Sequence, residues 1–275
     1  MKSVYKIGKS EGLNSSQAVL LMEIGEAHCC FAILDYANSM LVKACYYVAE
    51  EKDKNEILRE MIWTHSELKQ SFRQAVITYY TPENILVPSK FYKFNETQEL
   101  LKSVYENSQN VIMSESVAEW QLYNVYNVPS SMHTLISRNF ATGNFWHVYS
   151  ITLKNMIDQN AGGNIVIDFK TDSFSAVVIK NNSLQLAQIF SYVKAEGVLY
   201  WVLKTCKQLS LAQNEVKLTL SGLVDKRSSV FKGLYQYFQH IEFASPENDI
   251  QLSRDFEEYP VHFFSSIFKM ASCVS

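Results

Sequence analysis

Two stretches of this chain, residues 19–48 and 164–193, align with each other without a gap. In each stretch an apolar run ends in an acid, a polar turn follows, and two further alternating runs are joined by a turn that contains Asn and Ser. This pattern is typical of a three-stranded antiparallel meander. A repeat of this length predicts two similar halves, each with its own sheet. The alignment places Glu23 on Asp168 and Tyr47 on Tyr192.

The segments that follow the two meanders also correspond. Apolar residues recur at helical spacing in residues 54–68 and again in residues 198–209. Each half then has a buried strand, a second helix and a short strand. The buried strands are AVITYY at 75–80 and VKLTLSG at 216–222, the helices lie around 96–107 and 228–239, and the short strands are NVIMSE at 110–115 and HIEFAS at 240–245.

The predicted fold is therefore α/β, with two similar halves that each run β-β-β-α-β-α-β and end in a further helix. After the meander the strands are parallel, because each follows a right-handed helical crossover. Helices then cover both faces of a mixed sheet, which explains the apolar central strands. We place a hinge in DQNAGG, residues 158–163, so that the two halves are residues 1–160 and 161–275.

Composition argues against several classes of function. Hydrophobic residues make up 47% of the chain and charged residues 19%, as in a folded globular protein. A net charge of -3 and the lack of a basic cluster argue against nucleic-acid binding. We expect a cytoplasmic protein without a membrane span, because no apolar run is long enough to cross a bilayer. Five cysteines without CxxC spacing indicate neither a disulfide framework nor a zinc site.

Glycine is scarce, and this weighs against nucleotide chemistry. The chain has 9 glycines in 275 residues, about half of the usual share of roughly 7%. Loops that wrap phosphates need glycine, because its backbone can approach the ligand closely and can adopt a positive φ.

The repeated strand order resembles that of the actin-like ATPases, in which two ribonuclease-H-like halves clasp a nucleotide in a central cleft. Over nearly its whole length the chain also resembles an uncharacterised bacterial family, a domain of unknown function, with this fold. The segments LYNVYNVP at 122–129 and YPVHFFSSIFKMA at 259–271 contribute to that resemblance. The resemblance implies that Glu23 and Asp168 face each other across the cleft.

The resemblance also implies nucleotide-contacting positions at three turns. The first phosphate turn of the superfamily reads Asp-x-Gly, and here Glu23 replaces the acid while Gly25 is kept. The adenosine motif of the superfamily is an apolar strand that ends in a glycine pair before a helix. Here the strand ends in Ser221 and Gly222, and Leu223 replaces the second glycine.

The second phosphate turn of the superfamily reads Asp-x-Gly followed by small residues and threonine. Here Asp168 is kept, Lys170 replaces the glycine, and Thr171 and Ser173 follow. A side chain in place of the glycine adds strain of about 1–3 kcal/mol if the turn keeps its conformation. Lys170 either contacts phosphate with its ammonium group or is a solvated lysine at a hairpin tip, and we favour the second hypothesis.

Glu23 also has two interpretations. As a magnesium ligand, its extra methylene would displace the ion by about an ångström, which octahedral geometry tolerates badly. As a structural residue it would be hydrogen-bonded or solvated at the end of a strand, and we favour this interpretation. We predict no metal site: His28 and Cys30 share one face of a strand, and we interpret them as part of an ordinary strand.

The N-terminal segment IGKS, residues 7–10, resembles the end of a P-loop. However, Ser3 stands where a P-loop requires its earlier glycine, and no strand is predicted before the segment. We therefore interpret the first residues as a flexible tail.

Three hypotheses for function follow. The first is a non-catalytic actin-like module with a degenerate nucleotide cleft, which acts as a scaffold for another protein and has no catalytic residue and no cofactor. The second is a divergent switch protein that binds ATP with Mg²⁺ and changes domain closure. The third is a small-molecule kinase, which positions its substrates around magnesium and is undermined by Glu23, Lys170 and Leu223. We rank them in this order.

Overall fold

The chain divides into two compact units. Met1–Asn155, Asn248–Glu258 and Lys269–Ser275 form the first, and Met156–Glu247 and Tyr259–Phe268 form the second. The predicted boundary between residues 160 and 161 lies outside the described residues. The C-terminal part of the predicted second half is shared between the units. The computed structural model describes residues 1–10, 12–49, 54–105, 110–154, 156, 162–246 and 249–274.

The first unit is built on a mixed sheet with the strand order β1-β4-β3-β2-β5-β9, in which β15 also pairs with β4. Three antiparallel strands form the predicted meander, and two further strands run parallel to β2. The predicted meander with parallel crossovers is thus confirmed in this half. The strands are β1 (Lys2–Gly8), β2 (Ala18–Gly25), β3 (His28–Asp35), β4 (Met40–Val48), β5 (Gln74–Tyr80), β9 (Asn144–His147) and β15 (Gln251–Leu252).

Helices of the first unit bury one face of this sheet. Met61 and Met132 lie in one hydrophobic cluster with Leu20 and Met22 of β2, so α1 and α3 cover the same face. Every residue of β2 and β3 is buried, which is why both strands are almost continuously apolar. The helices are α1 (Lys54–Thr64), α3 (Ser130–Asn139) and α4 (Val148–Lys154).

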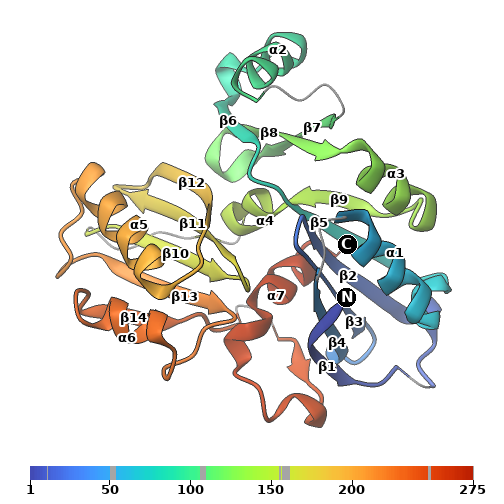
Figure 1. Cartoon of the computed structure of the whole chain (residues 1–275). Coiled ribbons are helices and arrows are strands. Elements are labelled where there is room, and N and C mark those ends of the chain that lie inside the picture. The colour runs from blue at the N-terminus through green and yellow to red at the C-terminus, as the bar shows by residue number, and fades with distance from the viewer. Residues whose placement is uncertain are drawn as a thin grey trace. The chain divides into compact units, whose positions relative to one another are not determined.

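The second unit has a five-stranded sheet with the order β12-β11-β10-β13-β14 (Figure 1). Its first three strands are antiparallel, and β13 and β14 follow in parallel, as predicted. Val198 and Val202 of α5 pack with Ile165 and Ile167 of β10 in the core of this unit. The elements are β10 (Asn164–Phe169), β11 (Ser173–Lys180), β12 (Ser183–Ser191), α5 (Ala195–Gln208), β13 (Lys217–Gly222), α6 (Ser229–Tyr235) and β14 (His240–Phe243), followed by the 3₁₀ helix Val261–Phe264. The last helix, α7 (Ser265–Ala271), begins in this unit and ends in the first.

A separate three-stranded antiparallel sheet in the first unit, with the order β6-β8-β7 and α2 beside it, corrects the predicted repeat (Figure 1). The helix predicted around 96–107 and the strand predicted at 110–115 both exist. However, the strand is part of this extra sheet and the helix packs beside it, so neither belongs to the core sheet. In the core sheet, α3 and β9 hold the places that α6 and β14 hold in the second unit. The pattern revealed the elements but not which sheet they join. The elements are β6 (Asn84–Pro88), α2 (Phe94–Val104), β7 (Asn110–Val117) and β8 (Leu122–Pro129).

The two hairpins that carry the acids have the same register. Glu23 is opposite Cys30 in the β2–β3 pair, and Asp168 is opposite Ser175 in the β10–β11 pair. The next strand pair of each half contains an irregularity at the aligned place. It lies between Ile33 and Leu34 in the first half and between Val178 and Ile179 in the second.

The third strands are offset from the gapless alignment by two residues. Tyr47 is opposite Cys29 and Phe190 is opposite Phe174, so Tyr47 corresponds to Phe190 and the predicted match with Tyr192 is wrong. The reason is the preceding turn. In the second half only Asn181 and Asn182 separate the strands, and both have positive φ, as in a tight two-residue hairpin.

The N-terminus is a strand, so the prediction of a flexible tail is wrong. Tyr5 and Ile7 of β1 are buried and alternate with the exposed Lys6, and β1 pairs antiparallel with β4. Gly8 ends this strand with φ +72, and a Cβ there would lie 1.9 Å from the carbonyl oxygen of Val42. Gly8 therefore allows β1 and β4 to approach each other closely at this point.

Candidate functional site

The first turn, residues 23–28, joins β2 to β3 and encloses its own acid. Glu23 is only 1% exposed, and a hydrogen bond of 3.0 Å joins its Oε1 to Nε2 of His28. The imidazole stacks on Tyr46, with ring centroids 5.4 Å apart, and meets the edge of Tyr80 at 5.1 Å. Glu23 is thus a buried, hydrogen-bonded residue, in line with the structural interpretation.

Gly25 makes room for this histidine. It does not have a positive φ, so the glycine is not needed for an unusual backbone conformation. A Cβ at this position would lie 2.5 Å from Cε1 of His28, which is a severe overlap. The space beside Gly25 is therefore filled by an imidazole ring.

The second turn, residues 168–173, contains a buried ion pair. Nζ of Lys170 lies 2.8 Å from Oδ2 of Asp168, and the lysine is only 3% exposed. The hypothesis that Lys170 is a solvated lysine is therefore wrong. Oδ1 of the same carboxylate accepts a hydrogen bond of 2.7 Å from Oγ of Ser221, which stands beside Asp168 on β13. The carboxylate is held from both sides within its own unit.

The backbone of Lys170 is also hydrogen-bonded on both sides. Its N–H donates to the carbonyl of Ser173 (2.8 Å), and its carbonyl accepts from the hydroxyl of Tyr192 (2.9 Å). Burial, and secondarily the nearby Asp172, raises the pKa of Tyr192, which keeps this donor protonated. Lys170 does not have a positive φ. The strain predicted for a retained glycine conformation is therefore absent.

The other residues predicted in this turn have different surroundings. Thr171 is exposed at the hairpin tip. Ser173 is buried, and its Oγ donates to Oδ1 of Asp172 (3.1 Å). Gly222 has φ +74, and a Cβ there would lie 2.2 Å from the carbonyl oxygen of Phe169. The structure thus brings Asp168, Lys170, Ser221 and Gly222 together and leaves Thr171 outside.

The third turn, residues 222–228, is bound by the chain's own groups. The carbonyl of Val224 accepts a hydrogen bond of 2.6 Å from Nε2 of His262, whose ring stacks on Phe243. Burial lowers the pKa of His262, which favours the neutral imidazole with its proton on the nitrogen that donates to Val224. Asp225 accepts from the backbone N–H groups of Arg227 and Ser228. At the start of α6, the side chain of Ser228 accepts a hydrogen bond of 3.1 Å from the N–H of Phe231, so the helix is capped by its own N-cap residue.

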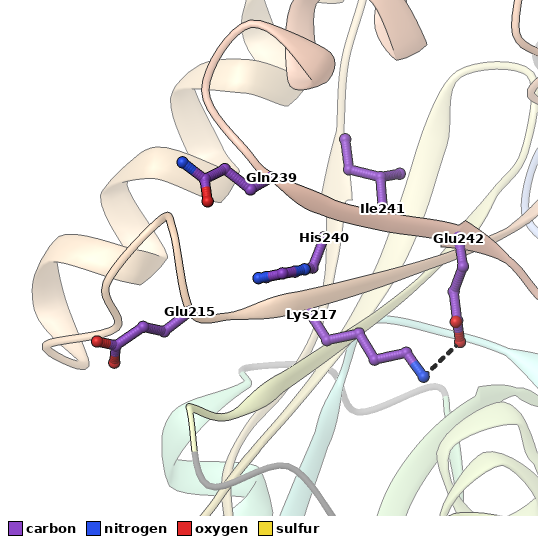
Figure 2. Close-up of a pocket in the computed structure, with 6 residues that line it drawn as sticks. All are labelled: Glu215, Lys217, Gln239, His240, Ile241 and Glu242. Carbon is purple, nitrogen blue, oxygen red and sulfur yellow. Dashed lines mark ion pairs between the residues drawn. The ribbon is translucent and has the colours of Figure 1, made fainter.

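A shallow hollow in the second unit lies at the wrong end of the sheet for a nucleotide. Its volume is about 430 Å³, and Lys217 and Glu242 form an ion pair of 2.7 Å across its floor (Figure 2). Lys217 and His240 are the first residues of β13 and β14. Open α/β sheets bind ligands at the carboxyl ends of their strands, where Asp168 and Ser221 lie. We therefore assign no ligand to this hollow.

A buried polar cluster in the first unit was not found by sequence reasoning. Burial raises the pKa of Glu115 on β7 to about 7, although Ser150 and Tyr126 hydrogen-bond to it. Burial also lowers the pKa of His147 to about 4, and its Nε2 donates to the carbonyl of Thr81 (2.9 Å). No pattern in the sequence marks these residues, because Glu115 and Tyr126 come from the extra sheet, His147 from β9 of the core sheet and Ser150 from α4.

In the ranges that the structure describes, no three His, Cys, Asp or Glu side chains gather as metal ligands would. Likewise, no helix in this part of the chain is both long and apolar enough to span a membrane. The carboxylate of Asp168 is paired with the ammonium group of Lys170.

Comparison with solved structures defines the class of fold. The chain is similar to a Bacteroides thetaiotaomicron protein with an actin-like ATPase fold and unknown function, with a TM-score of 0.73 and 15% identity over 88% of this chain and 96% of that one. It is also similar to a chain of a PilM–PilN type IV pilus biogenesis complex, with a TM-score of 0.56 and 12% identity over 94% of this chain and 98% of that one. The chain therefore has the actin-like ATPase fold, as predicted. At these identities the likeness extends to the fold alone.

The family follows from the sequence. The model of a family described as a protein of unknown function (DUF3822) matches residues 9–241, and the chain belongs to this family. No curated protein matches the chain.

Proposed function

We propose that this protein is a non-catalytic actin-like module that serves as a scaffold for another protein and no longer depends on a nucleotide. The observation that carries the proposal is the buried ion pair of 2.8 Å between Lys170 and Asp168. A cation brought to this carboxylate would first have to displace the ammonium group. Breaking a buried pair is strongly unfavourable, because it leaves an uncompensated charge.

The other two turns support the proposal. His28 fills the space beside Gly25, so a phosphate there would have to expel a buried imidazole. In the third turn, Asp225 already satisfies the backbone donors before α6. If each of the three changes costs about 1.4 kcal/mol of binding, nucleotide affinity falls roughly a thousandfold.

A partner-binding role fits both the fold and the state of the turns. The PilM–PilN complex contains a chain of this fold together with a protein partner. Docking another protein on the outside of such a module requires no phosphate-binding glycine. By analogy of fold, we infer that the partner of this chain is also a protein.

Calorimetric titration with ATP and Mg²⁺ tests the proposal. We expect no saturable binding below the millimolar range for the wild-type protein. Lys170→Gly and Lys170→Met should not weaken whatever binding remains. Lys217→Met is the matched control, because it also removes an ion-paired lysine. Lys217 lies at the start of β13, whereas the turns lie at the opposite ends of the strands.

The competing hypothesis is a switch protein that binds ATP with Mg²⁺ through a rebuilt site, in which Lys170 turns from Asp168 to the phosphates. It predicts tight, magnesium-dependent binding that Lys170→Gly abolishes and Lys217→Met preserves. That result would overturn the scaffold proposal.

A further inference from the structure

The corresponding outer edges of the two core sheets differ in how they are covered. In the first unit, β4 has β3 on one side and two strands on the other. β1 pairs with residues 43–48 of β4, and β15 pairs with Met40 and Leu41. In the second unit, β12 corresponds to β4 and pairs with β11. No other strand in the described part of the chain pairs with β12 (Figure 1).

The open edge of β12 lacks the features that usually protect such edges. The strand has nine residues, SLQLAQIFS, and contains no charged residue and no proline. Natural sheets protect open edges with charges, prolines or short strands. Other edge strands of this chain have these features: β9 and β14 have four residues each, and β6 ends in Pro88. An uncharged edge of this length is typical of a strand that another strand covers.

Exposed apolar side chains gather beside one end of β12. Val193 follows the strand and is 97% exposed, and Tyr200 on α5 is 57% exposed. Tyr200 contacts Trp201, whose ring centroid lies 4.9 Å from that of Phe190 on β12. Aromatic residues are enriched in protein interfaces, so this end of the edge has the composition of a contact surface.

The covered edge of the first unit shows which part of β12 can accept a strand. β4 contains the same irregularity as β12 and still pairs with β1. The pairing ends at this irregularity, where β1 has Gly8. A Cβ at Gly8 would clash with the carbonyl of Val42. Val42 corresponds to Gln185, which the β11–β12 register skips. An added strand without a glycine should therefore pair with residues 187–191 and end before Gln185.

We propose that β12 pairs antiparallel with β12 of a second copy of this chain, over residues 187–191 and around a two-fold axis at Ile189. In this register Ala187 faces Ser191 of the copy and Gln188 faces Phe190, so no like charges meet. Two-fold pairing buries the same surface on both copies and closes the assembly at a dimer. A contact this small gives a weak dimer, because stable interfaces bury about 1,000 Å² or more.

Sedimentation equilibrium over a range of protein concentrations tests the proposal. The wild-type protein should show a concentration-dependent monomer–dimer equilibrium. Gln188→Lys and Gln188→Glu should each raise the dissociation constant at least about tenfold, because the two residues 188 are diagonal neighbours across the axis and like charges repel there. Gln188 is exposed, so each variant should keep the wild-type thermal stability.

Mixing the two variants provides the decisive measurement. The lysine and glutamate forms should associate with each other more tightly than either does with itself. Gln185→Lys is the matched control on the same strand, since Gln185 is also exposed but lies outside the paired stretch, and it should dimerise like wild type. The proposal is wrong if the wild-type protein stays monomeric at several hundred micromolar, which would mean that another chain or another segment covers β12. It is also wrong if Gln188→Lys dimerises like the wild type, or if the mixture of Gln188→Lys and Gln188→Glu associates no more tightly than either variant alone.

Discussion

The two hairpin turns that carry Glu23 and Asp168 occupy the same place in their sheets but hold the acid with different partners. In the first turn the basic group is His28, at the start of β3, and the position between acid and histidine is Gly25. In the second turn the basic group is Lys170, which aligns with Gly25, while Ser173 aligns with His28. Each turn thus has one basic side chain, supplied from a different position.

This difference explains why one glycine is present and the other is not. A buried carboxylate is costly unless a partner compensates it, so each turn needs a base. Where the base is His28, the position of Gly25 must stay without a Cβ, because the ring lies there. Where the base is Lys170, the side chain itself replaces the glycine. The retained glycine is therefore no evidence of phosphate binding.

The largest effect should come from removing the lysine of the second turn. Lys170→Met leaves Asp168 buried without its cation and should lower the free energy of unfolding by about 3–5 kcal/mol. Urea denaturation measures this change. The double variant Asp168→Asn with Lys170→Met should recover most of the loss. Lys217→Met, at an exposed ion pair, should cost no more than about 1 kcal/mol. A Lys170→Met effect as small as that of Lys217→Met would contradict the buried pair.

The second effect tests a feature that only the first half has, the extra sheet with Glu115. The pKa of Glu115 is raised from 4.5 to about 7 by burial, so the folded state binds this proton more tightly than the unfolded state. Stability from this group is present at low pH and is lost as pH rises through about 7. Glu115→Gln should therefore stabilise the protein at pH 8 by up to about 3 kcal/mol and by much less at pH 5. Glu119→Gln, an exposed neighbour, is the control and should show no such pH dependence.

A transplant sharpens the comparison of the two turns. Gly25→Lys crowds His28, and His28→Ser leaves Glu23 without its histidine, so each single variant should be destabilised. The double variant reproduces the arrangement of the second turn and should be more stable than the sum of the single effects by about 1–2 kcal/mol. Denaturation of all four forms gives the coupling. If the two single changes in the free energy of unfolding simply add in the double variant, a lysine at position 25 does not replace His28 as the partner of Glu23.

The sequence predicted the core of the fold because period and polarity determine it. The gapless match of the first two strands gave the register of Glu23 and Asp168 correctly, since strands buried on both faces tolerate no slip. The third strand was misplaced because the turn at Asn181 and Asn182 is shorter than its counterpart. For β1, the alternation of Tyr5 and Ile7 was a usable signal that the polar ends of the segment obscured.

The state of the candidate site was less predictable. A lysine at a hairpin tip is usually solvated, whereas Lys170 is buried and pairs with Asp168. His28 was weighed as a metal ligand and interpreted as part of an ordinary strand, although its place at the start of β3 puts it near Glu23 once the hairpin register is known. Glu115 depends on the extra sheet, which the repeat pattern concealed.

The smallest effect should come from Thr171, the residue that the resemblance places at a phosphate and the structure places in solvent. The side chain is exposed at the tip of the second turn, while Lys170 and Ser173 on either side are buried. Thr171→Ala should therefore change the free energy of unfolding by less than about 0.5 kcal/mol. It should also leave the response to ATP and Mg²⁺ unchanged, whereas a threonine that contacts phosphate could not be replaced without loss. A clear change in nucleotide binding in Thr171→Ala, with stability intact, would show that the turn opens to a ligand and that the ion pair of Lys170 is only its resting state.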